Sequence, residues 1–354
     1  MNSDARRGET PRRDARRPPP AQTRGDAGSA TSALVLSLSA LALLALVLVA
    51  SVVWWNGGLG PLVGRERCVA DVAGTHVEMS PTQAEHAATI AAVAQRRDLP
   101  RRAVTVALAT AYQESDLQNL PHGDRDSAGL FQQRPSQGWG SFAQVTDPDY
   151  AAQRFYDALV AIPGWQTLAV TRAAQAVQRS AFPSAYQQHA AEARALASIF
   201  SGQAPAALTC TVQPAAVPAQ RENRDGLTPR ADALLQTMQR SLGPQSVGGF
   251  APGGVDRPGV SAHDDGRAID VFFRPHTDRD QRRAGWALAQ WAVANADRLQ
   301  VSVVIFDDHI WSWRRSPEGW RDYVSPFGDP RNPVERHLDH VHLEVAEGSA
   351  STPA

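Results

Sequence analysis

Two short stretches in the last third of the chain carry residue types that bind metals. In SAHDDGRAID, His263 precedes Asp270 by seven residues, and Gly266 allows a tight turn between them. In HLDHVHLEV, His340 and His342 would share one face of a strand because side chains alternate along it. Two imidazoles and one carboxylate leave an open fourth position on tetrahedral zinc, which is typical of a catalytic site. Zinc there would polarise a substrate carbonyl and activate water.

The same stretches resemble two motifs of one group of zinc peptidases. Residues 261–270 follow the pattern S-x-H-x-x-G-x-A-x-D of the group that includes D-Ala-D-Ala carboxypeptidases and dipeptidases. Residues 339–342 are similar to the H-x-H motif of relatives that cut peptidoglycan cross-links. The two motifs come in the family's order and cover most of residues 227–346. The resemblance implies a Zn²⁺ site with three ligands: His263, Asp270 and His342.

Two neighbours of the last ligand also have roles implied by this resemblance. His340 is expected beside the metal, as a base or as a stabiliser of the tetrahedral intermediate, and Asp339 stands where some relatives carry a Glu general base. Strand alternation would aim Asp339 away from His340, so we expect Asp339 to support the ligands or to act as a base from a loop. The remaining late histidines are expected to be surface or loop residues: His276, His309 and His337.

One stretch departs from the family pattern. Relatives often carry G-Y-R upstream, with an arginine that contacts the substrate or the developing oxyanion, whereas this chain has Gly249, Phe250 and Ala251. Arg257 is the candidate for that substrate contact; without a substitute, the activity would be weak or absent. Through its IWSW and DHVH stretches the domain also resembles a C-terminal module of actinobacterial secreted proteins, in which catalysis is not assured.

A glutamate in the first half of the chain ends an apolar helix. The segment AVTVALATAYQES predicts a helix up to Glu114 and Ser115, followed by a polar loop and then GLFQQ. A carboxyl group held half-buried at such a helix end suits a general acid for a glycosidic oxygen. The order E-S…G-L-F-Q resembles soluble lytic transglycosylases and goose-type lysozymes. It implies that Glu114 protonates the bond between amino sugars and that Gln132 shapes the sugar site.

The match to that family is incomplete. The chain departs from it in the HGDRD loop and in QRS, where many relatives have A-Y-N. No second carboxylate stands out as a nucleophile, because Asp124 and Asp126 are typical of loop turns. A substrate-assisted mechanism with one acid therefore fits better than a pair of carboxylates. Trp139 and Trp165 lie near the expected groove and could stack on sugar rings.

Length and charge set the broad organisation. With 354 residues the chain can form two domains, and a net charge of −1 gives no reason to expect nucleic acid as a partner. Residues 1–32 are predicted to be a disordered, arginine-rich tail, and residues 33–55 an apolar transmembrane anchor. The arginine excess predicts a cytoplasmic tail, so the bulk of a single-pass protein in the cell membrane would be extracytoplasmic. The alternative is a cleaved signal peptide.

Two folded domains are expected after the anchor. Residues 68–210 are predicted to form an all-α, lysozyme-like domain, residues 211–226 a Pro/Ala linker, and residues 227–346 an α+β, zinc-peptidase-like domain. Cys68 and Cys210 would form a disulfide after export, although two buried thiols are the alternative. Strands are expected in AIDVFF, VSVVIF and HVHLEV, and helices in TPRADALLQTMQRSL and QRRAGWALAQWAVANAD.

The patterns together favour a multidomain enzyme that remodels peptidoglycan. The helical domain would cleave glycan strands, and the α+β domain would hydrolyse stem-peptide or cross-link amide bonds with zinc. Two other functions stay open: a wall-binding or scaffold protein without turnover, and a surface protein that handles metals. The patterns indicate no particular oligomeric state.

Overall fold

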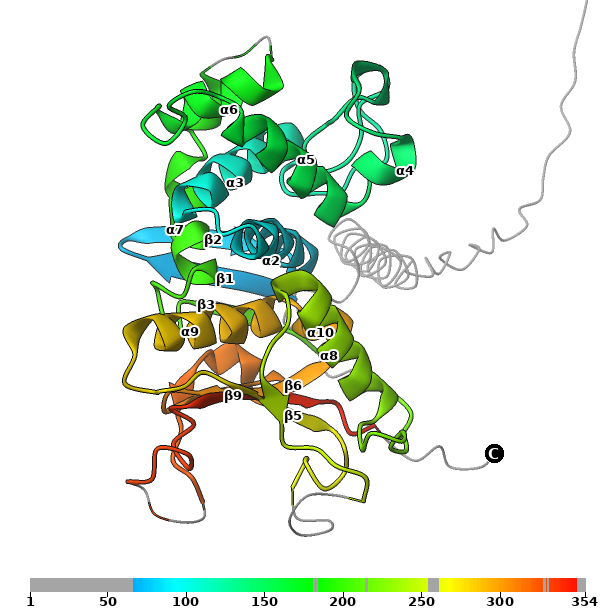
Figure 1. Cartoon of the computed structure of the whole chain (residues 1–354), viewed down its shortest axis with the longest axis vertical. Helices are drawn as coiled ribbons and strands as arrows, with labels where there is room; N and C mark the ends of the chain where they lie inside the picture. The colour runs from blue at the N-terminus through cyan, green and yellow to red at the C-terminus, as the bar shows by residue number, and fades with distance from the viewer. Residues whose placement is uncertain are drawn as a thin grey trace, which may run out of the picture. The chain divides into compact units, whose positions relative to one another are not determined.

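The computed structural model describes residues 66–348, except for 181, 183, 214–215, 254–260, 327–328 and 330 (Figure 1). From Gly64 onward the chain forms one unit. Among the described residues, no helix is long and apolar enough to cross a membrane. This finding contradicts the predicted fold class and location, which both include a transmembrane helix. The predicted tail (1–32) and anchor (33–55) themselves lie outside the described residues.

Helices make up most of the first part of this unit. α2 (Pro81–Arg96) begins at a Ser-Pro pair. The Ser80 hydroxyl accepts from the backbone N–H of Gln83, and the side-chain oxygen of Gln83 accepts from the backbone N–H of Ser80. α3 (Arg101–Ser115) is largely buried, which follows from its apolar sequence. The later elements are η1 (Pro135–Gln137), α4 (Phe142–Val145), α5 (Pro148–Val160), α6 (Val170–Gln178), η2 (Ala185–Gln187) and α7 (Ala190–Phe200).

The prediction of an all-α first domain is wrong. Beside the helices lies an antiparallel sheet of order β2-β1-β3, made of β1 (Arg67–Val72), β2 (Thr75–Met79) and β3 (Leu208–Thr211). Ala73 and Gly74, both at positive φ, join β1 to β2 as a two-residue hairpin turn. The two ends of the predicted helical domain therefore pair with each other as strands, and the fold is mixed α/β.

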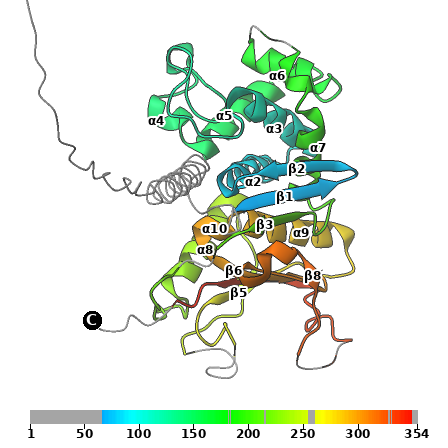
Figure 2. The ribbon, with the colours of Figure 1, turned by 180° about the vertical axis from the view of Figure 1, so that it is seen from behind.

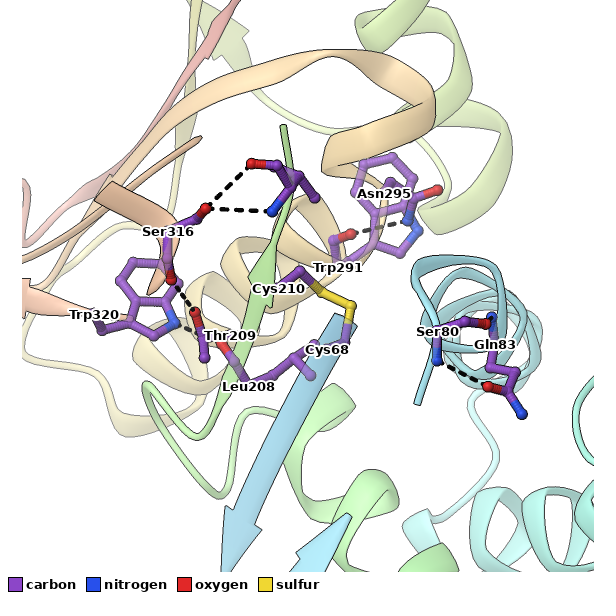
Figure 3. Close-up of a disulfide and its surroundings, with 11 residues drawn as sticks. Cys68, Ser80, Gln83, Leu208, Thr209, Cys210, Trp291, Asn295, Ser316 and Trp320 are labelled. Carbon is purple, nitrogen blue, oxygen red and sulfur yellow. Dashed lines mark hydrogen bonds between the residues drawn. A yellow bond between two sulfur atoms is a disulfide. The ribbon is translucent and has the colours of Figure 1, made fainter. Parts of the chain in front are cut away.

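A disulfide joins Cys68 to Cys210, as predicted (Figure 3). The two residues lie directly opposite each other on β1 and β3, and both are buried. Because the bond links residues 142 positions apart, loop entropy gives it up to about 5 kcal/mol of stabilisation. It fastens the start of the helical part to its end.

A second antiparallel sheet forms the other part, in the order β4-β5-β9-β6-β7-β8. Its strands are β4 (Val247–Gly248), β5 (Ala268–Phe272), β6 (Val301–Phe306), β7 (His309–Ser312), β8 (Arg321–Asp322) and β9 (His340–Val345). The accompanying helices are α8 (Pro229–Leu242), α9 (Arg279–Ala294), α10 (Ala296–Leu299) and η3 (Trp313–Glu318). The three expected strands are β5, β6 and β9. α8 and α9 cover one face of the sheet, and loops extend from the other (Figures 1 and 2).

A polar side chain on α9 ties the two parts together. Gln290 is fully buried; its amide donates to the carbonyl of Ile199 at 2.9 Å and accepts from the backbone N–H groups of Ala207 and Leu208. The indole of Trp320 donates to the carbonyl of Leu208 at 2.8 Å (Figure 3). The helical part and the second sheet thus share a hydrogen-bonded, packed interface in addition to the predicted linker, 211–226.

Candidate functional site

β5 and β9 bring two of the predicted ligands together. The strands are antiparallel neighbours, and Asp270 is directly opposite His342. Because side chains alternate along a strand, both residues share a face with His340. The other face carries buried core residues: Ile269, Val271, Val341 and Leu343. His263 comes from the turn before β5, where Gly266, at a φ of +63°, donates its N–H to the carbonyl of His263, as the predicted tight turn requires.

The three predicted ligands form one cluster. Nε2 of His263 lies 3.1 Å from Nδ1 of His342, and that Nδ1 lies 3.1 Å from Oδ1 of Asp270. Nε2 of His263 is 3.5 Å from the same carboxylate oxygen. One donor atom from each residue falls within 4.8 Å of the other two. This partly buried group of two imidazoles and a carboxylate could hold a metal ion.

The far side of each imidazole is fixed by a hydrogen bond. Nδ1 of His263 lies 2.6 Å from the carbonyl of Gly249, and Nε2 of His342 lies 3.0 Å from Oε1 of Glu344. When these nitrogens carry hydrogens, the opposite nitrogens point lone pairs at each other and at Asp270. Ligands of metal ions are usually oriented in this way, with the outer N–H donated to a carbonyl or carboxylate. The donor set therefore fits a metal.

Electrostatics in the cluster reflect the same geometry. Burial raises the pKa of Asp270, but hydrogen bonds from His263 and His342 outweigh it and hold this pKa far below its usual range. For His342, burial lowers the pKa, yet hydrogen bonds to Asp270 and Glu344 raise it to about 9. Without a metal, a proton on His342 thus stabilises the carboxylates around it. A metal cation would replace that proton.

Because Gly249 has no side chain, His263 and Asp270 can lie close together beside it. Its φ is +79°, and a Cβ there would lie 2.7 Å from Cε1 of His263 and 2.9 Å from Oδ2 of Asp270. Any larger residue would push the ligands apart. In the sequence, Gly249 begins the stretch in which Ala251 stands at the position of the relatives' arginine. Arg257, the proposed substitute for that arginine, lies outside the described residues.

His340 and Asp339 form a linked pair beside the ligands. Nδ1 of His340 lies 2.8 Å from Oδ1 of Asp339, and Nε2 of His340 lies 3.8 Å from Oδ1 of Asp270. Arg274 donates to Oδ2 of Asp339 at 2.7 Å. The expectation that Asp339 points away from His340 is wrong, because Asp339 precedes β9 and strand alternation does not apply to it. Asp339 orients the imidazole of His340.

His337 belongs to the site, although sequence reasoning expected only a loop or surface residue. Its ring centroid lies 4.6 Å from that of His340 and 5.6 Å from that of His342. Burial and the two nearby histidines lower its pKa to about 3. Its φ of +53° is unusual for a residue with a side chain, and Asp307 donates a backbone hydrogen bond to its carbonyl. The only sequence signal was its spacing of three from His340.

Glu114 lies at the end of α3 in a separate cleft of about 1230 Å³. The hydroxyl of Tyr186 donates to Oε1 of Glu114 at 2.7 Å. Ser115 donates to the carbonyl of Leu130 at 2.8 Å, which fastens the helix end to the G-L-F-Q segment. Sequence reasoning missed Tyr186. This residue lies in η2, after the QRS stretch in which the chain departs from the family pattern.

The other residues predicted for the sugar site differ in how they lie relative to this cleft. Gln132 lines it, but its amide oxygen accepts from Ser127 and its nitrogen donates to the carbonyl of Gly129, so it braces the loop. Asp126 accepts from Arg134 and from the backbone of Ser136, as expected of a loop residue. One tryptophan of the expected pair, Trp139, lines the cleft, whereas Trp165 is buried.

Comparison with known proteins adds one family. Residues 223–334 match a family model described as VldE, C-terminal domain. The match covers less than half of the chain; it includes His263 and Asp270 but ends before His342. No curated protein matches the sequence.

Proposed function

We propose that this chain is a peptidoglycan-remodelling hydrolase that binds zinc through His263, Asp270 and His342 and cleaves amide bonds of wall peptides. The observation that carries the proposal is the convergence of two imidazole nitrogens on one carboxylate oxygen, with the outer nitrogens fixed by Gly249 and Glu344. Mixed nitrogen and oxygen donors suit zinc, and three protein ligands leave a position for substrate. When bound, zinc supplies Lewis-acid polarisation of a carbonyl and activation of water.

In this proposal His340 acts as the general base and then as the general acid. Asp339, itself held by Arg274, accepts the hydrogen on Nδ1 of His340. Nε2 then faces the cluster as an acceptor, at 3.8 Å from Asp270. A base in that place can take a proton from the attacking nucleophile and return it to the leaving amine. The ring of His337 packs against that of His340.

A second reaction is proposed for the Glu114 cleft, namely cleavage of glycan strands with Glu114 as the acid. The support is the placement of one carboxyl group in a large cleft, held by the hydroxyl of Tyr186. Two described carboxylates besides Glu114 line the cleft, Asp124 and Asp157. Asp157 accepts from Arg97 at 2.7 Å, Asp126 accepts from Arg134, and Asp124 lies 4.0 Å from Arg125. Their engagement with arginines favours a substrate-assisted route with Glu114 as the acid.

Metal analysis tests the amide-hydrolase proposal. The chelator-treated full chain should take up one zinc, whereas His263→Ala and His342→Ala variants should take up none. His276→Ala, outside the cluster, is the matched control and should bind like the wild type. Purified peptidoglycan should then yield new peptide ends only with the proteins that bind zinc. A wild type that takes up no zinc would refute the site; zinc uptake with unchanged muropeptides would point to wall binding without turnover.

Mass analysis of glycan products tests the second reaction. Glu114→Gln should abolish new sugar ends while peptide cleavage continues. Tyr186→Phe should slow glycan cleavage by up to about tenfold, since it removes the hydrogen bond that positions the Glu114 carboxyl group. Equal glycan products from the wild type and Glu114→Gln would show that this carboxyl is not the acid.

A further inference from the structure

A pocket of about 350 Å³ lies between the first turn of α3 and the middle of α7, at the opposite end of α3 from Glu114. α3 and α7 pack side by side (Figures 1 and 2). No acidic or apolar residue lines this pocket. Its walls consist of three arginines and two hydroxyl residues: Arg101, Arg102, Thr105, Arg194 and Ser198.

The positive charge in this pocket is not balanced by the protein. Among the described residues, no carboxylate lies within ion-pair distance of Arg101, Arg102 or Arg194. Arg102 donates one Nη to the carbonyl of Leu168, but its Nε is buried without a hydrogen-bond partner. A buried guanidinium N–H without an acceptor is costly to the fold.

The hydroxyl groups hold the arginines in place. Arg101 donates to Oγ of Ser198 at 3.0 Å, and Ser198 in turn donates to the carbonyl of Arg194 at 2.9 Å. Oγ1 of Thr105 donates to the carbonyl of Arg101. Since both hydroxyl protons are used, the donors left for a ligand are guanidinium N–H groups.

The start of α3 adds to the positive potential. Its N-cap is Pro100, which provides no side-chain hydrogen bond, and the first turn contains no acidic residue. The first N–H groups of a helix and its dipole favour an anion at this end. Two of the three arginines, Arg101 and Arg102, belong to this first turn.

We propose that this pocket binds a phosphate group. Three guanidinium groups offer more N–H donors and more charge than the two oxygens of a carboxylate can use, whereas a phosphate presents up to four oxygens and two charges. The pocket is also open enough for the phosphate to be part of a larger molecule, because Arg101 and Arg194 are exposed. The site is separate from the proposed metal cluster and from the Glu114 cleft, so a test of phosphate binding does not depend on the proposed function.

Titration of the full chain tests the pocket. Inorganic phosphate is added to the wild type, to Arg194→Gln and to Arg101→Gln/Arg194→Gln, and binding is followed by calorimetry at constant ionic strength. These side chains are exposed, so the variants should fold, which circular dichroism verifies. Arg240→Gln on α8 is the matched control, an exposed arginine outside every part of the pocket. We expect one saturable site in the wild type and control, weakened about tenfold or more in the double variant.

Three further probes define the ligand. Acetate should bind much more weakly than phosphate, and equal binding of the two anions would overturn the phosphate assignment. Glycerol 1-phosphate and glycerophosphoglycerol distinguish a monoester from a diester, and saturable binding of either supports the proposal. Absence of saturable phosphate binding in the wild type, or equal affinity in the wild type and the double variant, would refute it.

Discussion

Replacing Gly249 with alanine is expected to weaken metal binding. The new Cβ would lie 2.7 Å from Cε1 of His263 and 2.9 Å from Oδ2 of Asp270, so both ligands would have to move. The hydrogen bond between Nδ1 of His263 and the Gly249 carbonyl would be disturbed as well. Loss of such an outer contact typically lowers metal affinity by about 10–100-fold. An alanine at positive φ also costs about 1–2 kcal/mol of folding free energy.

Gly253→Ala separates these two effects. Gly253 has a φ of +80°, but a Cβ there meets no atom within 4 Å. Both variants carry the backbone cost, whereas only Gly249→Ala disturbs the ligands. Zinc affinity is measured by competition with a chromophoric chelator, and stability by thermal unfolding of the metal-free proteins. If the two variants bind zinc equally well, the close approach of Gly249 does not shape the site.

Three other perturbations have expected outcomes. The pKa of His342 is raised from 6.5 to about 9, so its protonated form stabilises the metal-free fold fully below pH 6.5 and less as the pH rises to 9. The melting temperature without metal should therefore fall over this window while zinc affinity rises. Replacing both cysteines with serine should lower the free energy of unfolding in urea by up to about 5 kcal/mol, and a reductant should then have no further effect. Gln290→Ala should cost about 2–4 kcal/mol, because it leaves buried backbone groups unpaired; a variant as stable as the wild type would show that water replaces the amide.

The cluster of His263, Asp270 and His342 was predictable because its signals are local. His263 and Asp270 are close in sequence, and alternation in β9 fixes the face of His342. His337 was not predictable as a site residue, since its position depends on a backbone at positive φ and on a hydrogen bond from the β6–β7 turn. Asp339 was misplaced because the pattern does not show where the strand begins.

The fold was predictable in its helices and longer strands, where hydrophobic periodicity is strong. The pairing of β3 with β1 was missed because β3 has only four residues and is separated from β1 by the whole helical segment. Nothing in a local pattern reports such pairing. The role of Gln290 was hidden for the same reason, since its partners near Ile199 and Leu208 are far away in sequence.

The alternation of residues along β9 determines which mutations this strand can tolerate. Successive residues of the strand alternate between the His/Asp cluster and the core beneath α8 and α9. Inserting or deleting one residue would therefore send imidazoles into the hydrophobic interior and valines into the cluster. Point substitutions can tune this strand, but length changes cannot. Variation in length is consequently expected to accumulate in the loops around it, and a library designed to alter the cluster should hold β9 at constant length.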